Sequence, residues 1–228
     1  MIQRILMVFV MLLAVLGPAL AGPMGPVRPA DGKFSLAAVG AYDQRELALP
    51  SGTGGECEVT NASPLVLLSY GLTDRVELSA RFGASFLKLQ SPATGGASVN
   101  ATTRPAWGGG LDALLLQGRR WSLAAQADYL AHSGHKNAAR LGATRVDYRE
   151  WQAGMQLQYQ YDLLQPYLGA SYSDCRVRYR YGWESERSRH RIGVYGGAGC
   201  DFSSHYSGFI EGRFLDETGA AAGLRYTF

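Results

Sequence analysis

Only a few side chains of this sequence could carry acid–base or nucleophilic chemistry. Two of the four histidines stand in the segment His132-Ser133-Gly134-His135, where an imidazole beside a hydroxyl or a carboxylate could act as a general base in hydrolysis. The other titratable residues expected near the same level are Asp147, Glu150, Asp174, Glu184 and His190. Polar residues at strand ends are usually solvated, so we do not expect an enzyme.

No other pattern indicates a bound group. The cysteines and histidines have no spacing typical of a metal site, and Gly108-Gly109-Gly110 lacks the strand–turn–helix context of a phosphate-binding loop. We therefore expect neither a metal nor a cofactor, and we interpret the three glycines as close strand packing or a bend. With 22 basic and 19 acidic residues, the charge balance gives no reason to expect nucleic acid as a partner.

Arginines are concentrated between residues 176 and 191, where they alternate with other residues. The segment contains Arg176, Arg178, Arg180, Arg187, Arg189 and Arg191, together with Glu184 and Glu186. A guanidinium binds a phosphate through two parallel hydrogen bonds, so these arginines are candidate contacts for an anionic group. The alternative is a solvated hairpin of alternating charge.

The elements that must position these residues follow an export signal. Arg4 precedes the apolar run Ile5 to Leu16, and Ala19-Leu20-Ala21 places small residues at the first and third positions of a cleavage site. This order predicts a secretory signal peptide over residues 1–21. The alternative is a membrane anchor, but a helix of this run would span only ~18 Å of the ~30 Å hydrocarbon core. We expect residues 22–32 to form a loose leader.

From Lys33 onward, apolar and polar residues alternate with a period of two. In the clearest segment, Trp151, Ala153, Met155, Leu157 and Tyr159 fall on one face and four glutamines on the other. Successive side chains of a strand point to opposite faces, so each such segment has one apolar and one polar wall. No apolar run in this part of the chain is long enough for a membrane-spanning helix.

Ten such segments predict an all-β fold: one closed antiparallel up-and-down transmembrane β-barrel over residues 33–228, with eight or twelve strands as alternatives. The expected strands are 33–44, 58–71, 75–89, 105–117, 121–132, 145–161, 165–180, 190–202, 207–215 and 219–228. Tight connections alternate with long ones. An even strand number therefore places both chain ends and the tight turns at one end of the barrel, and the long loops at the other.

The composition of the two faces predicts that the apolar face points outward. The polar faces carry Gly, Ser, Gln and mixed charges rather than the long Lys and Glu side chains of a solvated exterior. The apolar faces end in aromatic residues such as Trp107, Trp121, Trp151 and Tyr226. A lipid-facing band needs apolar atoms with aromatic girdles, and a closed barrel pairs every backbone group in hydrocarbon. A soluble β-sandwich or a lipocalin-like barrel is the alternative.

Three segments resemble those of Gram-negative outer-membrane β-barrel proteins. Tyr70-Gly71-Leu72-Thr73-Asp74-Arg75-Val76 resembles their strand–turn–strand hairpin, Pro166-Tyr167-Leu168-Gly169-Ala170 a recurring strand opening, and Gly223-Leu224-Arg225-Tyr226-Thr227-Phe228 their C-terminal signature. The resemblance is to the superfamily of small OmpA/OmpW-like barrels, although those have eight strands. It implies an outer-membrane location, a periplasmic leader over residues 22–32, and recognition of Leu224, Tyr226 and Phe228 by the barrel-assembly machinery.

By strand parity, most charged residues of the polar faces point into the lumen. They are Glu77, Arg81, Asp112, Asp128, Glu150, Glu211, Arg213 and Arg225. If the last hairpin is centred on Thr218, Glu211 faces Arg225 directly. Buried charges must be paired, and barrels of about eight strands are filled by side chains. We therefore expect an ion-pair network that plugs the lumen.

These expectations favour a structural or surface-interaction scaffold, acting as a monomer in outer-membrane lipid and lipopolysaccharide. The arginines Arg178, Arg180, Arg187 and Arg189 would then contact lipopolysaccharide phosphates. The first alternative is a narrow, non-specific channel for small solutes or ions. The second is an enzyme: His132 and His135 show some similarity to lipid A deacylases, and the nearby acids to omptin proteases, although the flanking residues of neither family are present.

The three cysteines, Cys57, Cys175 and Cys200, are an odd number for an oxidising compartment. In the expected register, Cys175 and Cys200 lie about five residues apart along adjacent strands, or ~16 Å. That separation is too large for a disulfide, so we expect mostly free thiols.

Overall fold

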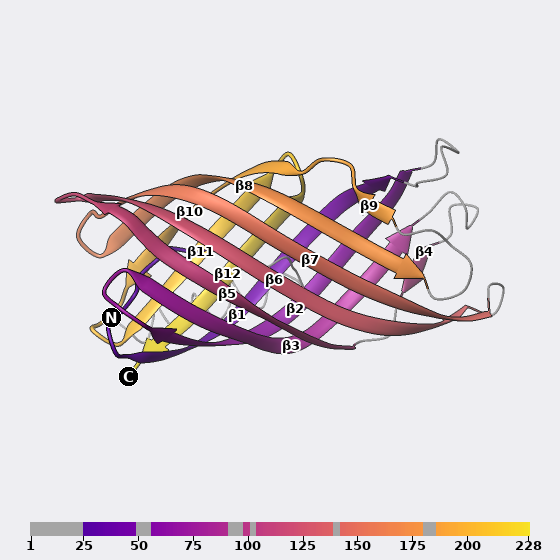
Figure 1. The fold of residues 1–228 in the computed structure, drawn as a ribbon, viewed down its shortest axis with the longest axis horizontal. Coiled ribbons are helices and arrows are strands. Elements are labelled where there is room, and N and C mark those ends of the chain that lie inside the picture. The colour runs from indigo at the N-terminus through magenta and orange to yellow at the C-terminus, as the bar shows by residue number, and fades with distance from the viewer. Residues whose placement is uncertain (1–24, 49–55, 91–97, 101–103, 139–141, 180–185) are drawn as a thin grey trace.

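The computed structural model describes residues 25–48, 56–90, 98–100, 104–138, 142–179 and 186–228. Within these residues, ten long antiparallel strands form one sheet that closes on itself, accompanied by two three-residue strands (Figure 1). The predicted ten-stranded barrel is therefore confirmed. Among the described residues there is no helix, and hence none long and apolar enough to cross a membrane.

The strands follow one another around the barrel in chain order. The long ones are β1 (Phe34–Ala48), β2 (Glu56–Gly71), β3 (Val76–Gln90), β5 (Arg104–Gln117), β6 (Trp121–Ala138), β7 (Gly142–Tyr159), β8 (Leu164–Tyr179), β10 (Ile192–Asp201), β11 (Tyr206–Phe214) and β12 (Thr218–Thr227), and the short ones are β4 (Ser98–Asn100) and β9 (Glu186–Ser188). Pairing of β1 with β12, which sets Ser35 opposite Thr227, closes the wall.

The two ends of the barrel differ as the alternation of short and long connections predicts. Tight turns at 72–75, 118–120, 160–163 and 202–205 join the strands at one end, which we call the turn end. Both labelled chain ends lie there (Figure 1). The opposite, long-loop end extends further than the sequence indicates, because β1 runs to Ala48 and β6 to Ala138.

The last hairpin has a different register from the one predicted. Arg213 pairs with Gly219 and Glu211 with Ala221, so the turn consists of residues 215–217 rather than being centred on Thr218. The expected pair of Glu211 and Arg225 is therefore wrong, and Arg225 lies opposite Ser207. Leu215 reaches this tight turn with a φ of 83°, a conformation that costs a residue with a Cβ about 1–2 kcal/mol. The two residues that follow Leu215 in this turn, Asp216 and Glu217, are buried.

The last three strands are short, so the barrel wall they form extends less far toward the long-loop end. β10, β11 and β12 have 10, 9 and 10 residues, whereas β6 and β7 have 18 each. Above this short section, β9 pairs with β8 on one side and with β1 on the other. The short strand β9 therefore closes the wall where β10, β11 and β12 do not reach.

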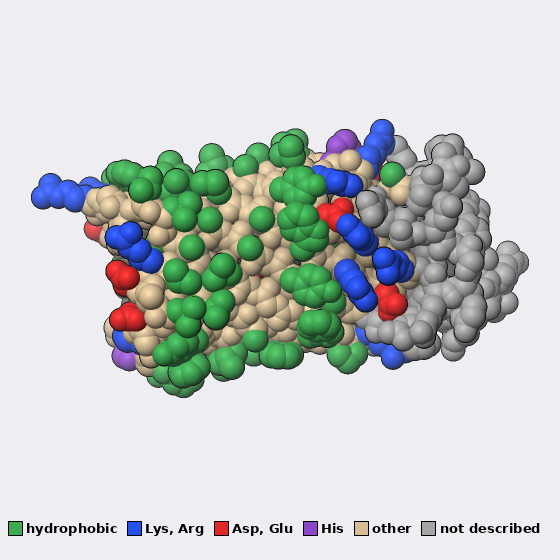
Figure 2. Space-filling model, viewed as in Figure 1, with side chains coloured by type: hydrophobic (Ala, Val, Ile, Leu, Met, Phe, Trp, Pro, Cys, Tyr) green, Lys and Arg blue, Asp and Glu red, His purple; other side chains and the backbone are tan. Residues whose placement is uncertain are grey.

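The apolar face points outward, as predicted. Phe82 is 59% exposed and Met155 50% exposed, while alternate polar residues of the same strands are buried in the lumen. Figure 2 shows the hydrophobic side chains as a broad band between two zones of charge. Along β7, Trp151 and Tyr159 lie eight residues apart, which is ~26 Å along a strand and ~20 Å across a membrane at a tilt of ~40°. This height is close to the ~25 Å lipid-facing band of such barrels.

Because the apolar face points to lipid, a charged residue introduced on it should destabilise the barrel by an amount that depends on its depth in the membrane. Met155 lies midway between Trp151 and Tyr159, so Met155→Arg should destabilise the folded barrel by about 2–4 kcal/mol, whereas Tyr159→Arg at the interface should cost about 0–1 kcal/mol. Urea unfolding of the protein refolded into lipid vesicles measures both. Equal costs at the two positions would contradict a lipid-facing band centred on Met155.

Candidate functional site

The lumen gathers most of the buried charge of the molecule, and it contains the predicted ion-pair residues. Glu77, Arg81, Asp128, Glu150, Glu211 and Arg213 are buried, and Asp112 and Arg225 are half-buried. Towards the turn end, Arg225 Nη2 donates to Glu77 Oε2 at 2.5 Å, and Arg81 pairs with Asp128. Asp112 lies opposite Glu77 in the register of β3 and β5.

The centre of the network is Arg45, which sequence reasoning placed in a loop. Its guanidinium pairs with Glu150 and Glu217, contacts Asp43 at 3.2 Å, and donates to Ser173 Oγ at 2.9 Å. Arg45 is 2% exposed, so this cation is held by carboxylates rather than by water. The signal that could have identified it is the parity of Asp43 and Arg45, which continues that of the inward residues earlier in β1.

Glu217 joins Arg45 to a second buried cation, Arg213. Arg213 donates to Glu217 and to Glu211, both at 2.7 Å, and to Gln152 at 3.2 Å. The network therefore connects β1, β7 and β11 with the short turn after β11. Removing one member would leave a buried partner with fewer opposite charges, so the turn and the wall stabilise each other.

Two glycines lie so close to lumen carboxylates that a side chain would not fit at either position. A Cβ on Gly193 would lie 1.8 Å from Asp216 Oδ1, and a Cβ on Gly110 would lie 2.1 Å from Asp128 Oδ1. Asp216 Oδ2 in turn accepts a hydrogen bond from Ser173 Oγ at 2.8 Å. The close packing expected at residues 108–110 is thus confirmed. At Gly110 it leaves room for a lumen carboxylate, and at Gly108 a Cβ would lie 2.1 Å from the backbone oxygen of Tyr129.

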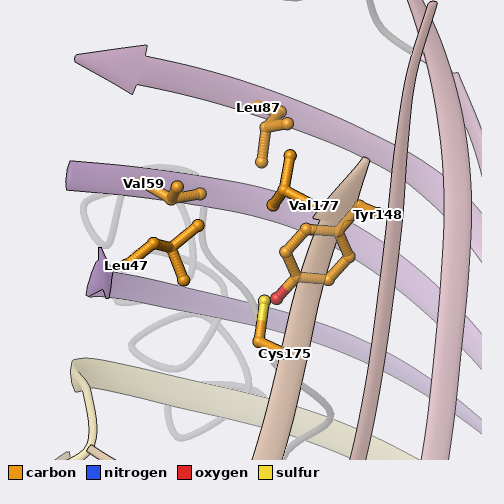
Figure 3. Packing of buried hydrophobic residues seen from close by; sticks show 6 residues of the cluster. All are labelled: Leu47, Val59, Leu87, Tyr148, Cys175 and Val177. Carbon is orange, nitrogen blue, oxygen red and sulfur yellow. The ribbon is translucent and has the colours of Figure 1, made fainter. Parts of the chain in front are cut away.

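An apolar cluster lies in the lumen next to the Arg45 network, on the side of the long-loop end. It comprises Leu47, Val59, Leu87, Tyr148, Cys175 and Val177, each at most 4% exposed (Figure 3). Tyr148 connects the two layers because its hydroxyl donates to Glu150 at 2.8 Å. By excluding water, the cluster lowers the local dielectric constant and strengthens the ion pairs beneath it.

The N-terminal segment enters the lumen from the turn end. Gly25 N donates to Glu211 Oε2 at 2.9 Å, and Val27 N donates to Gln158 Oε1 at 2.7 Å. Arg28 pairs with Asp201. Of the described part of the expected leader, residues 25–28 are therefore bound inside the barrel rather than loose, while Asp31 and Gly32 are exposed and pair with Gly71 at the end of β2. The predicted signal peptide and its boundary at residue 21 lie outside the described residues.

Two cavities lie beside this segment. One cavity of about 60 Å³ lies beside Gly25, Glu77 and Arg225, which is room for about two water molecules at ~30 Å³ each. A larger one, of about 350 Å³, opens at the turn end between Arg28, Arg120 and neighbouring residues. The N-terminal segment lines both cavities.

The residues proposed for acid–base chemistry are not assembled into one cluster. His132 points into the lumen, where its ring stacks on Tyr148 with centroids 4.6 Å apart. Its Nε2 lies 3.1 Å from Ser85 Oγ, and that hydroxyl is also 2.9 Å from Asn61 Oδ1. Glu150 binds Arg45 in the lumen, whereas Asp174 binds Arg176 on the outer wall.

Several other candidates lie at the edge of, or outside, the described part. His190 is exposed, the side chain of His135 is not described, and Glu184 is not described at all. Among the described residues, no group of His, Cys, Asp and Glu could hold a metal ion.

Arg176, Arg178, Arg189 and Arg191 lie on or near the outer wall. Arg178 and Arg189 are exposed, and Arg189 Nη1 is 3.9 Å from a Glu46 carboxylate oxygen. Arg187 lies in β9, with only its backbone described, and Arg180 lies outside the described residues.

The C-terminal residues and two of the cysteines are also placed. Tyr226 packs against Phe228 and Tyr206, with centroids 4.9 Å apart in each case, and Leu224 precedes them on the same outward parity. Cys175 and Cys200 are free, as expected, but they are further apart than predicted. Cys200 pairs with Leu164, eleven residues before Cys175 on β8. The side chain of Cys57 is outside the described part.

With the barrel and its filled lumen described, the class of protein follows. The family described as outer membrane protein beta-barrel domain matches residues 73–227, more than half of the chain. The chain belongs to this family and is an outer-membrane β-barrel protein.

Solved structures share the fold at low identity. The translocator domain of the autotransporter NalP from Neisseria meningitidis is 10% identical with a TM-score of 0.50, covering 99% of this chain and 95% of that chain. The transport unit of the autotransporter AIDA-I from Escherichia coli is also 10% identical with a TM-score of 0.50, covering 92% and 93%. The outer membrane protease OmpT from Escherichia coli is 12% identical with a TM-score of 0.44, covering 90% and 100%. A search of curated proteins finds no match.

The Arg45 network predicts a large effect of a single truncation. Arg45→Ala leaves Asp43, Glu150 and Glu217 buried without their shared cation and should destabilise the barrel by about 3–5 kcal/mol. The matched control, Arg189→Ala, removes an arginine whose side chain is 49% exposed and should cost about 0–1 kcal/mol. Denaturant unfolding in micelles compares them, and similar costs would contradict a central role for Arg45.

Proposed function

We propose that this outer-membrane barrel is a closed, non-conducting scaffold that holds its long connections at the cell surface for structural or adhesive contacts. The observation that carries the proposal is the filling of the lumen by three successive layers. The N-terminal segment occupies the turn end, the Arg45 network crosses the middle, and the apolar cluster covers the network.

The chemistry of the layers supports a permanent closure. A hydrated ion passing the Arg45 network would have to displace carboxylates that are already paired with guanidinium groups in a dry environment. It would then meet Leu47, Val59 and Val177, which offer no polar ligand. A narrow channel for small solutes or ions is therefore the less favoured alternative.

The proposal also covers export, insertion into the outer membrane and the oligomeric state of the mature protein. Export by a signal peptide over residues 1–21 would deliver the chain to the periplasm, and the assembly machinery would recognise Leu224, Tyr226 and Phe228. A single chain suffices for the mature form because β1 and β12 pair with each other and close the barrel wall. We propose no enzymatic role, since His132 is engaged in the lumen.

Planar-bilayer recordings test the closed state. The refolded wild-type protein should show no conductance steps, and deletion of residues 22–28 alone should stay silent because the Arg45 network and the apolar cluster remain. The deletion combined with Tyr148→Ala weakens all three layers and should produce steps, which serves as the positive control. Stepwise conductance of the wild type at low voltage would overturn the proposal in favour of a channel.

A further inference from the structure

Three arginines lie side by side across three adjacent strands of the wall. Arg176 of β8 is directly opposite Arg149 of β7 on one side and Arg187 of β9 on the other. Like charges that face each other across strands destabilise a sheet. An anion bound among exposed arginine side chains relieves such repulsion.

The row is on the outer surface rather than in the lumen. Arg149 is exposed and shares its parity with Trp151, which is 43% exposed on the lipid-facing side. The intervening residue, Glu150, points inward to Arg45. Figure 2 shows basic side chains gathered on the outer wall, between the hydrophobic band and the long-loop end.

A buried acid organises part of this cluster. Asp174, on the outward parity of β8, is only 4% exposed because the neighbouring side chains cover it. Arg176 Nε donates to its Oδ2 at 2.9 Å, and Arg191 Nη2 lies 3.7 Å from its Oδ1. Arg191 Nη1 also donates to the Tyr172 hydroxyl at 3.1 Å. Both guanidinium groups are thus oriented, while their side chains stay about two-fifths exposed.

The height of the cluster identifies the kind of anion. Trp151 is opposite Asp174 in the register, and its ring packs on Tyr172 with centroids 5.2 Å apart. Aromatic residues of this kind mark the boundary between acyl chains and headgroups. Arg149 and Arg176 are two residues further towards the long-loop end, ~7 Å along the strands. Their guanidinium groups therefore lie at the level where the outer leaflet carries its headgroup phosphates.

We propose that the outer wall at β7, β8 and β9 binds the phosphate groups of lipid A, the membrane anchor of lipopolysaccharide. Arg149, Arg176 and Arg191 form the phosphate contacts, Asp174 positions two of them, and Trp151 with Tyr172 packs against the adjoining acyl chains. Arginine suits this role because its planar donors bind phosphate oxygens in pairs and remain charged at every physiological pH. The site adds Arg149, Arg176 and Arg191 to the contacts expected of Arg178, Arg180, Arg187 and Arg189. It does not depend on whether the lumen conducts.

Binding of purified lipid A to the micelle-held protein, measured by native mass spectrometry and by the change in Trp fluorescence, tests the assignment. Wild-type protein should bind bisphosphorylated lipid A at least ten-fold more tightly than lipid A with both phosphates removed, and added NaCl should weaken the binding. Dephosphorylated lipid A that binds equally well, or binding unaffected by salt, would overturn the proposal. So would phosphatidylglycerol that competes at equal concentration, because the surface would then recognise any anionic lipid.

Variants locate the site. R149Q combined with R176Q should lower the affinity at least ten-fold, whereas R75Q, in a tight turn at the opposite end of the barrel, should leave it unchanged. R176K keeps the charge but loses the paired donors and should give an intermediate affinity. Heat-modifiable migration on gels checks that each variant is folded, and the comparison of the two lipid A forms on the wild type needs no variant. Unchanged affinity of the folded double variant would place the phosphate elsewhere and overturn the proposal.

Discussion

Hydrocarbon offers no water to the backbone, and this one constraint governs the whole structure. Every N–H and C=O group in the membrane must find its partner within the sheet, so the first and last strands have to meet. The pairing of Ser35 with Thr227 and of the residues that follow achieves this closure. Once the sheet is closed, its apolar side faces the lipid and its polar side faces inward, which leaves the charges of ten strands in one narrow space.

Many of these lumen charges form ion pairs. Arg45 and Arg213 share Glu217, and the glycines at 110 and 193 leave room for carboxylates beside the wall. The high glycine content, 29 of 228 residues, therefore has a packing explanation as well as a conformational one. The N-terminal segment contributes backbone donors to the same system, since Gly25 N donates to Glu211. The same contacts therefore stabilise the folded barrel and fill its lumen.

The shape of the wall depends on the same network. β10, β11 and β12 stop early, and their turn places Asp216 and Glu217 inside, where Ser173, Arg45 and Arg213 bind them. β9 then closes the wall above by pairing with β8 and β1. This arrangement brings arginines of β8 and β9 next to one another on the outer surface. The asymmetry of the barrel thus connects the ion pairs of its lumen to the arginine cluster on the outer wall at β8 and β9.

The sequence by itself determined the fold class, the ten strands, their inward and outward faces and most of the charged lumen residues, because a strand's side-chain period of two is a local property that any segment displays. It did not determine Arg45 or Glu217, since their neighbours are typical of loops and only contacts with distant strands extend the sheet or bury the turn around them. The pairing of Arg225 with Glu77 instead of Glu211 depended on a shift of the turn from residue 218 to residues 215–217. Neither the binding of the N-terminal segment in the lumen nor the row of arginines could be predicted from the sequence. Both depend on strand register and barrel closure, which bring together residues that no pattern along the chain relates.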